Sequence, residues 1–329
     1  MIQPPLITII TPTYNRADLI EKSIQSVIEQ NTTIPFAWEM IIIDDWSTDN
    51  TKEIVRKYIK KYPDNIFYFY QKNSWIPGAA RNVGLNHMNK KSDYTIFLDS
   101  DDELKRDLIY RGLKKIEELK KRKLYDRTIW TYFLCEDEYQ NVIWKKRILK
   151  WKKERFFDYN SFLQGEINIE MGMRLRSNIF LTDPKLRFAK NIISETVMWA
   201  QMWKRMDENW LKLYLRDYVG RFYRLNHTTW DKRICRTISD KRFKNNAEGN
   251  KVILQFIEKD LKERWYTKQH SEYLFRIGIN YILCGEKKMG LGYMKKSLQT
   301  HFRTTIWSMY IISKVSKKII LFLYKKFVI

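Results

Sequence analysis

The stretch Ile96-Phe97-Leu98-Asp99-Ser100-Asp101-Asp102 joins an apolar run directly to three carboxylates. Such a run is typical of a buried strand, and the carboxylates come where that strand should meet solvent. Carboxylate oxygens suit Mg²⁺ and Mn²⁺, and a cation that the protein binds incompletely keeps sites for other oxygens, such as those of a diphosphate. Because an isolated Asp-Ser-Asp is also common in solvated turns, the sequence upstream decides between the two interpretations.

Upstream of this stretch, three further apolar segments are predicted strands: residues 6–10, 40–43 and 66–70. Apolar residues at helical spacing follow the first two strands: Leu19, Ile20, Ile24, Val27 and Ile28, then Ile54, Val55, Tyr58 and Ile59. A short helix is expected between the segment 77–84 and the fourth strand, 94–98. Alternating strands and helices predict a doubly wound, mostly parallel α/β sheet, in which ligands bind beyond the carboxyl ends of the strands.

Polar clusters follow three of the four predicted strands, and a glycine-containing segment precedes the fourth. The four segments are Thr11-Pro12-Thr13-Tyr14-Asn15-Arg16, Asp44-Asp45-Trp46-Ser47-Thr48-Asp49, Gly78-Ala79-Ala80-Arg81-Asn82-Val83-Gly84 and Asp99-Ser100-Asp101-Asp102. In this order they resemble the motifs of the family-2 glycosyltransferases of the GT-A fold. Four motifs in the right order are far rarer by chance than any one of them.

For the nucleoside of a nucleotide-sugar donor, the resemblance implies five binding residues. Thr11, Pro12 and Tyr14 would shape the nucleoside pocket. Asp45 would accept a hydrogen bond from the base, which gives specificity because a pocket built around a hydrogen bond rejects analogues that cannot form it. Arg81 would lie beside the nucleotide.

The resemblance places the diphosphate and its cation at the acidic motif. Asp99 and Ser100 would lie close to the ribose and diphosphate, and Asp101, together with Asp99, would ligate Mn²⁺ or Mg²⁺. Such a cation stabilises the negative charge that develops on the leaving diphosphate. His227, in a segment similar to a Tyr-Arg-x-x-His motif of the family, would help to hold the metal, although a lone histidine is more often a hydrogen-bonded structural residue.

Structural interpretations exist for several of these motif residues. Asp49 has a side chain that is preferred at helix N-caps. Gly78 and Gly84 could serve only a turn and close packing. Arg81 could pair with a surface carboxylate, as many exposed arginines do.

A predicted strand at 173–180 and the loop 183–188 lead to a candidate general base. In the family, a similar loop enters a helix that opens with Glu-Asp, whose second member is the base. Trp199 matches the aromatic residue four positions after that base, which places Glu195 at the base position and Ser194 before it. A carboxylate there would take the proton of an acceptor hydroxyl in a direct displacement that inverts the anomeric carbon. Alternatively, Glu195 interacts only with the helix dipole.

Three regions follow from this pattern: a nucleotide-sugar-binding half of the GT-A domain at 1–103, an acceptor-binding half at 104–232, and a helical basic C-terminal domain at 233–329. The apolar pattern of the last region predicts several helices, with a helical hairpin at Gly285-Glu286.

The formal net charge of +23 lies entirely outside the first hundred residues, which contain 11 Lys+Arg and 11 Asp+Glu. From residue 301 onward there is no acidic residue. Lysines interrupt each apolar run there before the roughly 20 residues that a transmembrane helix needs. An amphipathic helical segment over 303–329 would bind an anionic membrane surface, and the alternative is a helix packed on its own domain with a solvated basic face.

Composition and the N-terminus favour a cytoplasmic protein, peripheral on the inner face of the membrane. The three cysteines lie far apart and show neither a disulfide framework nor metal-site spacing. No basic region precedes a long apolar core at the N-terminus, so a signal peptide is not expected.

Together, the residues and the resemblance predict an inverting, metal-dependent glycosyltransferase of the hexosyltransferase type. Its donor would be a UDP-sugar, and its acceptor a hydroxyl of a glycan or lipid-linked glycan in bacterial surface polysaccharide synthesis. A non-catalytic glycan-binding relative remains an alternative. A nucleic-acid-binding protein would explain the basic charge but lacks a recognised motif, and a nucleotidyltransferase would show a Gly-rich basic signature near its first strand.

Overall fold

The computed structural model describes residues 3–72, 74, 76–137, 139–140, 142, 154–165, 171–189, 196–209, 211–222 and 239–327 of the 329-residue chain. The chain divides into two compact units. Unit 1 comprises residues 1–159, 167–190 and 205–227, and unit 2 comprises residues 160–166, 191–204 and 228–329. Each unit is described separately, and the three predicted regions remain a prediction.

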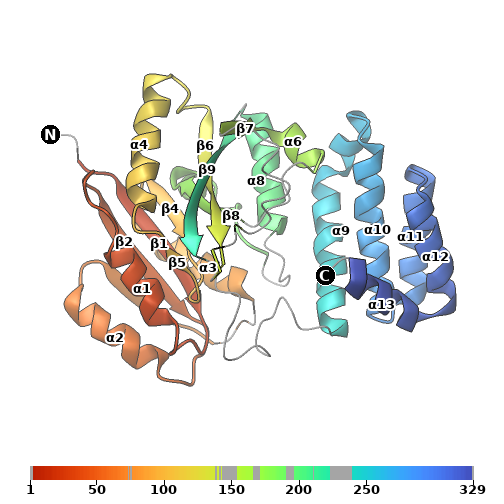
Figure 1. Ribbon diagram of the computed structural model, residues 1–329, viewed down its shortest axis with the longest axis horizontal. Coiled ribbons are helices and arrows are strands. Elements are labelled where there is room, and N and C mark those ends of the chain that lie inside the picture. The colour runs from red at the N-terminus through yellow and green to blue at the C-terminus, as the bar shows by residue number, and fades with distance from the viewer. Residues whose placement is uncertain are drawn as a thin grey trace. The chain divides into compact units, whose positions relative to one another are not determined.

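A sheet in which nine strands are described forms the centre of unit 1 (Figure 1). The strands are β1 (Leu6–Thr13), β2 (Ala37–Asp44), β3 (Ile66–Tyr70), β4 (Tyr94–Phe97), β5 (Glu103–Leu104), β6 (Thr128–Glu136), β7 (Glu154–Phe157), β8 (Met171–Arg176) and β9 (Lys212–Phe222). Their order is β3-β2-β1-β4-β8-β6-β9-β5, with β7 paired to β9. The parallel quartet β3-β2-β1-β4 confirms the predicted α/β fold class, whereas the remainder of the sheet mixes parallel and antiparallel pairs.

Helices cover both faces of the parallel quartet. On one face, Ile7 and Ile9 of β1 share a buried core with α1 (Ile20–Ile28), α2 (Thr51–Lys61) and α4 (Leu108–Lys121). On the other face, Ile10 packs against α3 (Pro77–His87) so closely that a Cβ atom at Gly84 would overlap its side chain. Alternation along a strand explains why neighbouring isoleucines serve different layers.

The short helix expected after the segment 77–84 instead begins within it, because helix α3 spans Pro77–His87. Pro77 is the first residue of this helix, where its missing N–H is not needed and its fixed φ suits the helix. Arg81 therefore projects from this helix.

The predicted strand 173–180 was wrong in its second half. Strand β8 ends at Arg176, and helix α7 (Asn178–Thr182) follows. The hydroxyl of Ser177, between them, is buried and lies 2.8 Å from the hydroxyls of both Ser92 and Thr95. These long-range hydrogen bonds fix the end of the strand, and local sequence does not reveal them.

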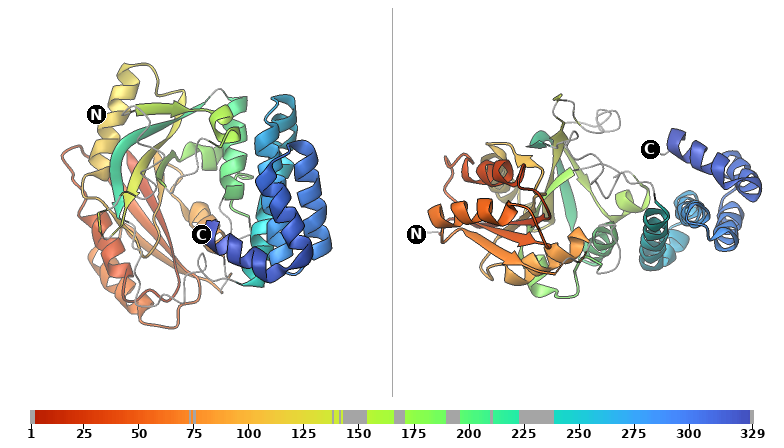
Figure 2. Two further views of the ribbon diagram at one scale, coloured as in Figure 1. Left: turned by 45° about the vertical axis from the view of Figure 1, so that its right-hand side comes forward. Right: turned by 90° about the horizontal axis from the view of Figure 1, so that it is seen from below.

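Unit 2 is helical. Its main helices are α9 (Asp240–Glu263), α10 (Thr267–Leu283), α11 (Lys287–Thr300), α12 (Thr304–Val315) and α13 (Lys317–Phe327), and it also contains most of α6 (Tyr159–Leu163) and the first part of α8 (Thr196–Glu208). Figures 1 and 2 show α9 to α12 side by side, with α13 turning back. Phe243, Ile279, Leu283 and Ile320 form a buried cluster that ties α13 to α9 and α10.

The predicted helical hairpin is confirmed as α10 and α11. Gly285, in the turn between them, has a φ of +98°, which glycine adopts at little cost. Within the described residues, no helix combines the length and the apolar character needed to cross a bilayer.

Candidate active site

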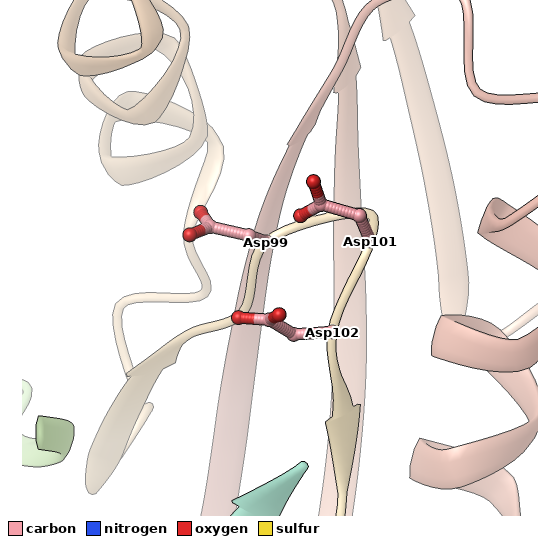
Figure 3. Close-up of side chains that lie close together, drawn as sticks. All are labelled: Asp99, Asp101 and Asp102. Atoms are coloured by element: carbon pink, nitrogen blue, oxygen red, sulfur yellow. The ribbon is translucent and has the colours of Figure 1, made fainter. Parts of the chain in front are cut away.

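Three carboxyl groups come together in the turn between β4 and β5. One ligand oxygen from each of Asp99, Asp101 and Asp102 lies within 4.8 Å of those of the other two. Figure 3 shows the three side chains projecting from this one turn toward the same side. The turn stands beside the end of β1, because Ile10 of β1 is paired with Phe97 of β4 and accepts a hydrogen bond from the Leu98 N–H at 3.1 Å.

Each carboxylate of this acidic turn faces a different arginine. The three nitrogen-to-oxygen distances are 2.5 Å for Arg81 and Asp99, 3.9 Å for Arg16 and Asp101, and 3.4 Å for Arg221 and Asp102. The side chains of Asp102 and Arg221 are only 1% and 6% exposed, whereas Asp101 is 20% exposed. Asp102 therefore braces the turn from inside, and the more exposed Asp99 and Asp101 face outward.

The Asp99 carboxyl group is held in its charged form. Burial raises its pKa, but the guanidinium groups of Arg81, Arg221 and Arg16 more than offset this, and the pKa lies below its ordinary value. A carboxylate that stays ionised is the form that binds a cation.

Carboxylate oxygens at this spacing suit a hard divalent cation such as Mn²⁺ or Mg²⁺. Asp101 and Asp99 would hold it, since Asp102 is buried against Arg221. The three arginines balance the charge of the three carboxylates. A diphosphate that binds here would add negative charge, and a divalent cation would neutralise that added charge.

Arg81 reaches the acidic turn from helix α3. Its side chain is buried, and its guanidinium carbon lies 5.5 Å from the centre of the Phe188 ring. The Phe188 ring and the Asp99 carboxylate therefore hold the guanidinium group in place. Arg81 pairs with the acidic turn, and not with an unrelated surface carboxylate.

Three of the predicted nucleoside-binding residues, Thr11, Pro12 and Tyr14, lie at the end of β1. Thr11 is fully buried and Tyr14 is exposed, with Pro12 between them partly buried. The Oγ1 atoms of Thr11 and Thr13 have no hydrogen-bond partner among the described residues. Ser100, in the acidic turn, is buried.

Asp44 and Asp45 differ in their surroundings although they are adjacent. Asp44 is fully buried, and its carboxylate accepts hydrogen bonds from the Tyr68 hydroxyl at 2.6 Å and from the Ser47 N–H at 2.7 Å. Burial, together with this bond to Asp44, raises the pKa of Tyr68. Asp44 therefore supports the loop that follows β2.

Asp45 already accepts three hydrogen bonds within the chain. Its donors are the Gln71 amide at 2.6 Å and the N–H and hydroxyl of Ser74, each at 2.9 Å. A carboxylate can accept about four hydrogen bonds. Asp45 therefore keeps capacity for about one further hydrogen bond, and Gln71 and Ser74 belong to its surroundings.

Asp49 hydrogen-bonds to the first residue of helix α2, but the N-cap of this helix is Asn50, one residue later than the alternative interpretation expected. The Asp49 carboxylate accepts hydrogen bonds from the Thr51 N–H at 3.1 Å and hydroxyl at 2.6 Å, and from the Ala17 N–H at 3.1 Å. Burial raises the pKa of Asp49, but these hydrogen bonds outweigh that effect and lower it.

Two predicted site residues, Glu195 and His227, lie outside the described residues. Helix α8 begins at Thr196, directly after Glu195. Sequence reasoning did not assign roles to Arg16, Arg221 or Asp102. Arg16 was detectable as the last residue of its motif, but Arg221 reaches Asp102 only because β9 pairs with β5.

The family model named Glycosyl transferase family 2 matches residues 8–176. Among curated proteins, the uncharacterized glycosyltransferase MG060 of Mycoplasma genitalium is 30% identical over 190 residues, which cover 55% of this chain and 58% of that protein. The poly(ribitol-phosphate) beta-glucosyltransferase of Bacillus spizizenii is 37% identical over 106 residues, or 32% of this chain and 16% of that protein. The matched region therefore spans only part of either relative.

Solved structures resemble the fold over most of the chain. S. aureus TarS 1-349 in complex with UDP-GlcNAc has a TM-score of 0.65 at 15% identity, covering 94% of this chain and 87% of that one. Mannosyltransferase PcManGT from Pyrobaculum calidifontis, in complex with GDP-Man and Mn²⁺, has a TM-score of 0.54 at 13% identity, covering 95% and 80%.

Proposed function

This chain belongs to glycosyl transferase family 2, and on that premise we propose that it transfers a sugar from a UDP-sugar to a hydroxyl of a bacterial surface glycan or lipid-linked glycan. The observation that carries the proposal is the acidic turn at the end of β4, where three carboxylates lie within 4.8 Å of one another and each faces an arginine. A turn whose carboxylates only contacted solvent would not require three buried or half-buried arginines around it.

On the donor side, Asp101 and Asp99 hold the divalent cation, whose chemistry is to stabilise the negative charge of the departing diphosphate. Arg81 orients Asp99 through a short ion pair, and Arg16 lies next to Asp101. Arg221 and Asp102 keep the turn in place from inside. Mn²⁺ is favoured because a neighbour of the same fold was solved with it.

On the acceptor side, Glu195 acts as the general base. It directly precedes helix α8, a position from which a carboxylate can be aimed at a bound substrate. It removes the proton of the acceptor hydroxyl while that oxygen bonds to the anomeric carbon and the bond to the diphosphate breaks. One displacement inverts the configuration at that carbon. His227 is a candidate additional ligand of the cation.

The proposed acceptor class is supported by the name of the B. spizizenii relative, which acts on poly(ribitol-phosphate). A UDP-sugar donor is favoured because TarS, which shares the fold, was solved with UDP-GlcNAc.

The experiment that tests the proposal is a thermal-shift titration with UDP, GDP, dTDP and CDP, each with and without Mn²⁺. A Mn²⁺-dependent rise with UDP, lost in Asp101→Asn, is expected because a ligand that binds only the folded state stabilises it. Absence of a shift with all four nucleotides would reject the proposal.

Glu195→Gln tests the general base. Because the variant keeps the size of the side chain but cannot accept the proton, UDP binding should persist while transfer to acceptor falls by at least about 100-fold. Near-normal transfer would place the base elsewhere, and Asp183→Asn and Glu170→Gln would be measured next.

We also propose that the outward face of α12 and α13 binds an anionic membrane surface. Among the side chains that the structure describes, α12 buries Ile306 and α13 buries Ile320, while other apolar residues of both helices are exposed. The exposed residues are Trp307 and Ile311 on α12, and Ile319 and Phe322 on α13, together with the exposed Lys314, Lys317 and Lys318. Aromatic and aliphatic side chains beside lysines suit the headgroup layer of anionic lipid.

Truncation would be a poor test of this surface, because loss of Ile320 would uncover Phe243 and Leu283. Trp307→Ser combined with Ile311→Ser is better, since both side chains are exposed. Less of this variant should sediment with vesicles containing phosphatidylglycerol, while its unfolding temperature stays the same. Sedimentation equal to that of the wild type would reject the membrane surface.

A further inference from the structure

An exposed pair of aromatic rings lies at the carboxyl ends of β2 and β3. Trp46 follows Asp45 after β2, and Tyr70 is the last residue of β3. The two rings stack with centroids 6.1 Å apart and planes 23° apart, and the residues are 42% and 50% exposed. Lys52 supports the pair with its Nζ atom 5.7 Å from the centre of the Tyr70 ring.

The backbone at Trp46 is strained. Its φ of +81° lies in the left-handed region, which is unfavourable for a bulky side chain. The bonds around it hold this conformation, because the Asp45 N–H donates to the Thr13 carbonyl at 2.8 Å and the Ser47 N–H donates to Asp44 at 2.7 Å. Asn15 joins the same network: its N–H donates to the Ser47 hydroxyl at 2.8 Å, and its side chain accepts the Thr48 N–H at 2.8 Å.

Burial does not compensate for this strain, since much of the Trp46 ring remains in solvent. Strained residues are enriched in ligand-binding loops and also occur in other turns, so the place of this ring at the strand ends, and not its strain alone, points to a ligand. A glycine at this position would fit the backbone better and would leave the surrounding hydrogen bonds in place. The indole ring is therefore the feature that the strained loop presents.

The order of the strands indicates what this ring contacts. The acidic turn follows β4, and the order β3-β2-β1-β4 places Trp46 two strands away from it and Tyr70 three strands away. With strands about 4.8 Å apart, these steps are roughly 10 Å and 14 Å along the edge of the sheet. A nucleoside diphosphate whose phosphates lie at the acidic turn, and which extends along this edge, brings its base toward the end of β2.

We infer that Trp46, stacked on Tyr70, is a binding surface for the nucleobase of the donor. This inference rests on the proposed function, because it assumes that the diphosphate lies at the acidic turn. Stacking on an aromatic ring tolerates any base and adds affinity without hydrogen bonds. It would add to the one further hydrogen bond that Asp45, already engaged by Gln71 and Ser74, can still accept.

The test compares Trp46→Gly with a matched control, Trp265→Gly, in the full chain. Trp265 also has a left-handed φ, of +60°, and is 84% exposed, but it lies in the turn between α9 and α10. Both variants should unfold at the same temperature as the wild type or higher, because glycine relieves the backbone strain.

Calorimetric titrations then measure UDP and pyrophosphate, each with Mn²⁺. Trp46→Gly should weaken UDP about tenfold and leave pyrophosphate, which has no base, unchanged. Trp265→Gly should change neither affinity. Tyr70→Leu, which keeps residue 46 intact, should weaken UDP in the same direction by a smaller factor.

The remaining outcomes separate two kinds of failure. If the wild type binds UDP but Trp46→Gly binds it equally well, or if UDP and pyrophosphate weaken together, the base surface is rejected while the proposed function stands. An unchanged UDP affinity with a raised KM for the acceptor would reject the base surface and assign the rings to an acceptor sugar. If the wild type binds no nucleoside diphosphate, the proposed function itself fails, and the inference fails with it.

Discussion

Asp101 and Asp102 are adjacent in the chain but have different surroundings. Asp102 is buried beside the buried Arg221, whereas Asp101 is partly exposed and 3.9 Å from Arg16. Charge pairs in these two environments contribute differently to stability, because removing one member of a buried pair takes the nearest opposite charge from the other in a region with little water.

Asp102→Asn should therefore lower the free energy of unfolding by about 3 kcal/mol. Asp101→Asn, a matched change in the same turn, should alter it by less than about 1 kcal/mol but abolish stabilisation by UDP and Mn²⁺. Urea unfolding with and without these ligands measures both effects. Equal losses of stability in the two variants would contradict the assignment of Asp102 as the internal support.

At the scale of elements, helices α10 and α11 approach closely at two glycines. A Cβ atom added at Gly290 would lie 2.5 Å from the Gly278 carbonyl oxygen and 2.9 Å from the Ile282 nitrogen. Backbone atoms of a packed helix cannot move aside as a flexible side chain can. The hairpin therefore depends on these two small residues.

Gly290→Ala should destabilise the protein by about 1–3 kcal/mol, because it overfills this crossing. Gly292, on the same helix, has no atom within 4 Å of an added Cβ. Gly292→Ala should instead stabilise by about 0.5–1 kcal/mol, since alanine favours the helix. Chemical denaturation of both variants measures these effects, and a shift of the same sign in both would contradict the close crossing.

Contact between α9 and α10 also makes stability depend on pH. His270 on α10 is buried, with its Nε2 atom 3.2 Å from a carboxylate oxygen of Glu258 on α9. Burial lowers the pKa of His270; Glu258 opposes this effect, and Lys262 adds to it. The folded state therefore favours the neutral imidazole, whereas the unfolded chain takes up a proton more readily.

Since the folded pKa is depressed, this contribution to stability is present above the unfolded pKa of about 6.5 and is lost as the pH falls through the folded value. Wild-type protein should be less stable at pH 5.5 than at pH 7.5, and His270→Asn should show a smaller difference. Urea unfolding of both proteins at the two pH values measures this difference in the free energy of unfolding. An identical pH dependence in the variant would show that other groups are responsible.

At the scale of the whole molecule, the chain forms two compact units with separate buried clusters. The acidic turn belongs to unit 1, and the crossing of α10 and α11 belongs to unit 2. Units with separate cores can unfold in separate steps, so a single unfolding temperature need not describe the chain.

Differential scanning calorimetry should resolve two transitions. UDP with Mn²⁺ should raise the transition of unit 1, by the equivalent of about 2.7 kcal/mol at a hundred times the Kd. Gly290→Ala should lower the transition of unit 2. A single transition that both perturbations move together would contradict independent unfolding.

The sequence alone determined the parallel strands β1 to β4, the helices α1 and α2 between the first three of them, and the acidic turn. These features follow from residues close together in the chain, where apolar periodicity and a sudden change to carboxylates carry the information. It failed at Ser177, which ends β8 and whose hydroxyl contacts those of Ser92 and Thr95, and at the start of α3, which lies at Pro77 and not after Gly84. The C-terminal helices were predicted, but their division into buried and exposed faces was not.

Only the tertiary structure decided which groups surround the site. Arg221 lies more than a hundred residues beyond Asp102 and reaches it because β9 pairs with β5. Gln71 and Ser74 donate hydrogen bonds to Asp45. The hydrogen bonds of Asn15, Asp44 and Ser47 hold Trp46 in its strained conformation. Local patterns encode which face of a strand or helix is apolar. They do not encode which distant side chain meets it, because that depends on the strand order and packing of the complete fold.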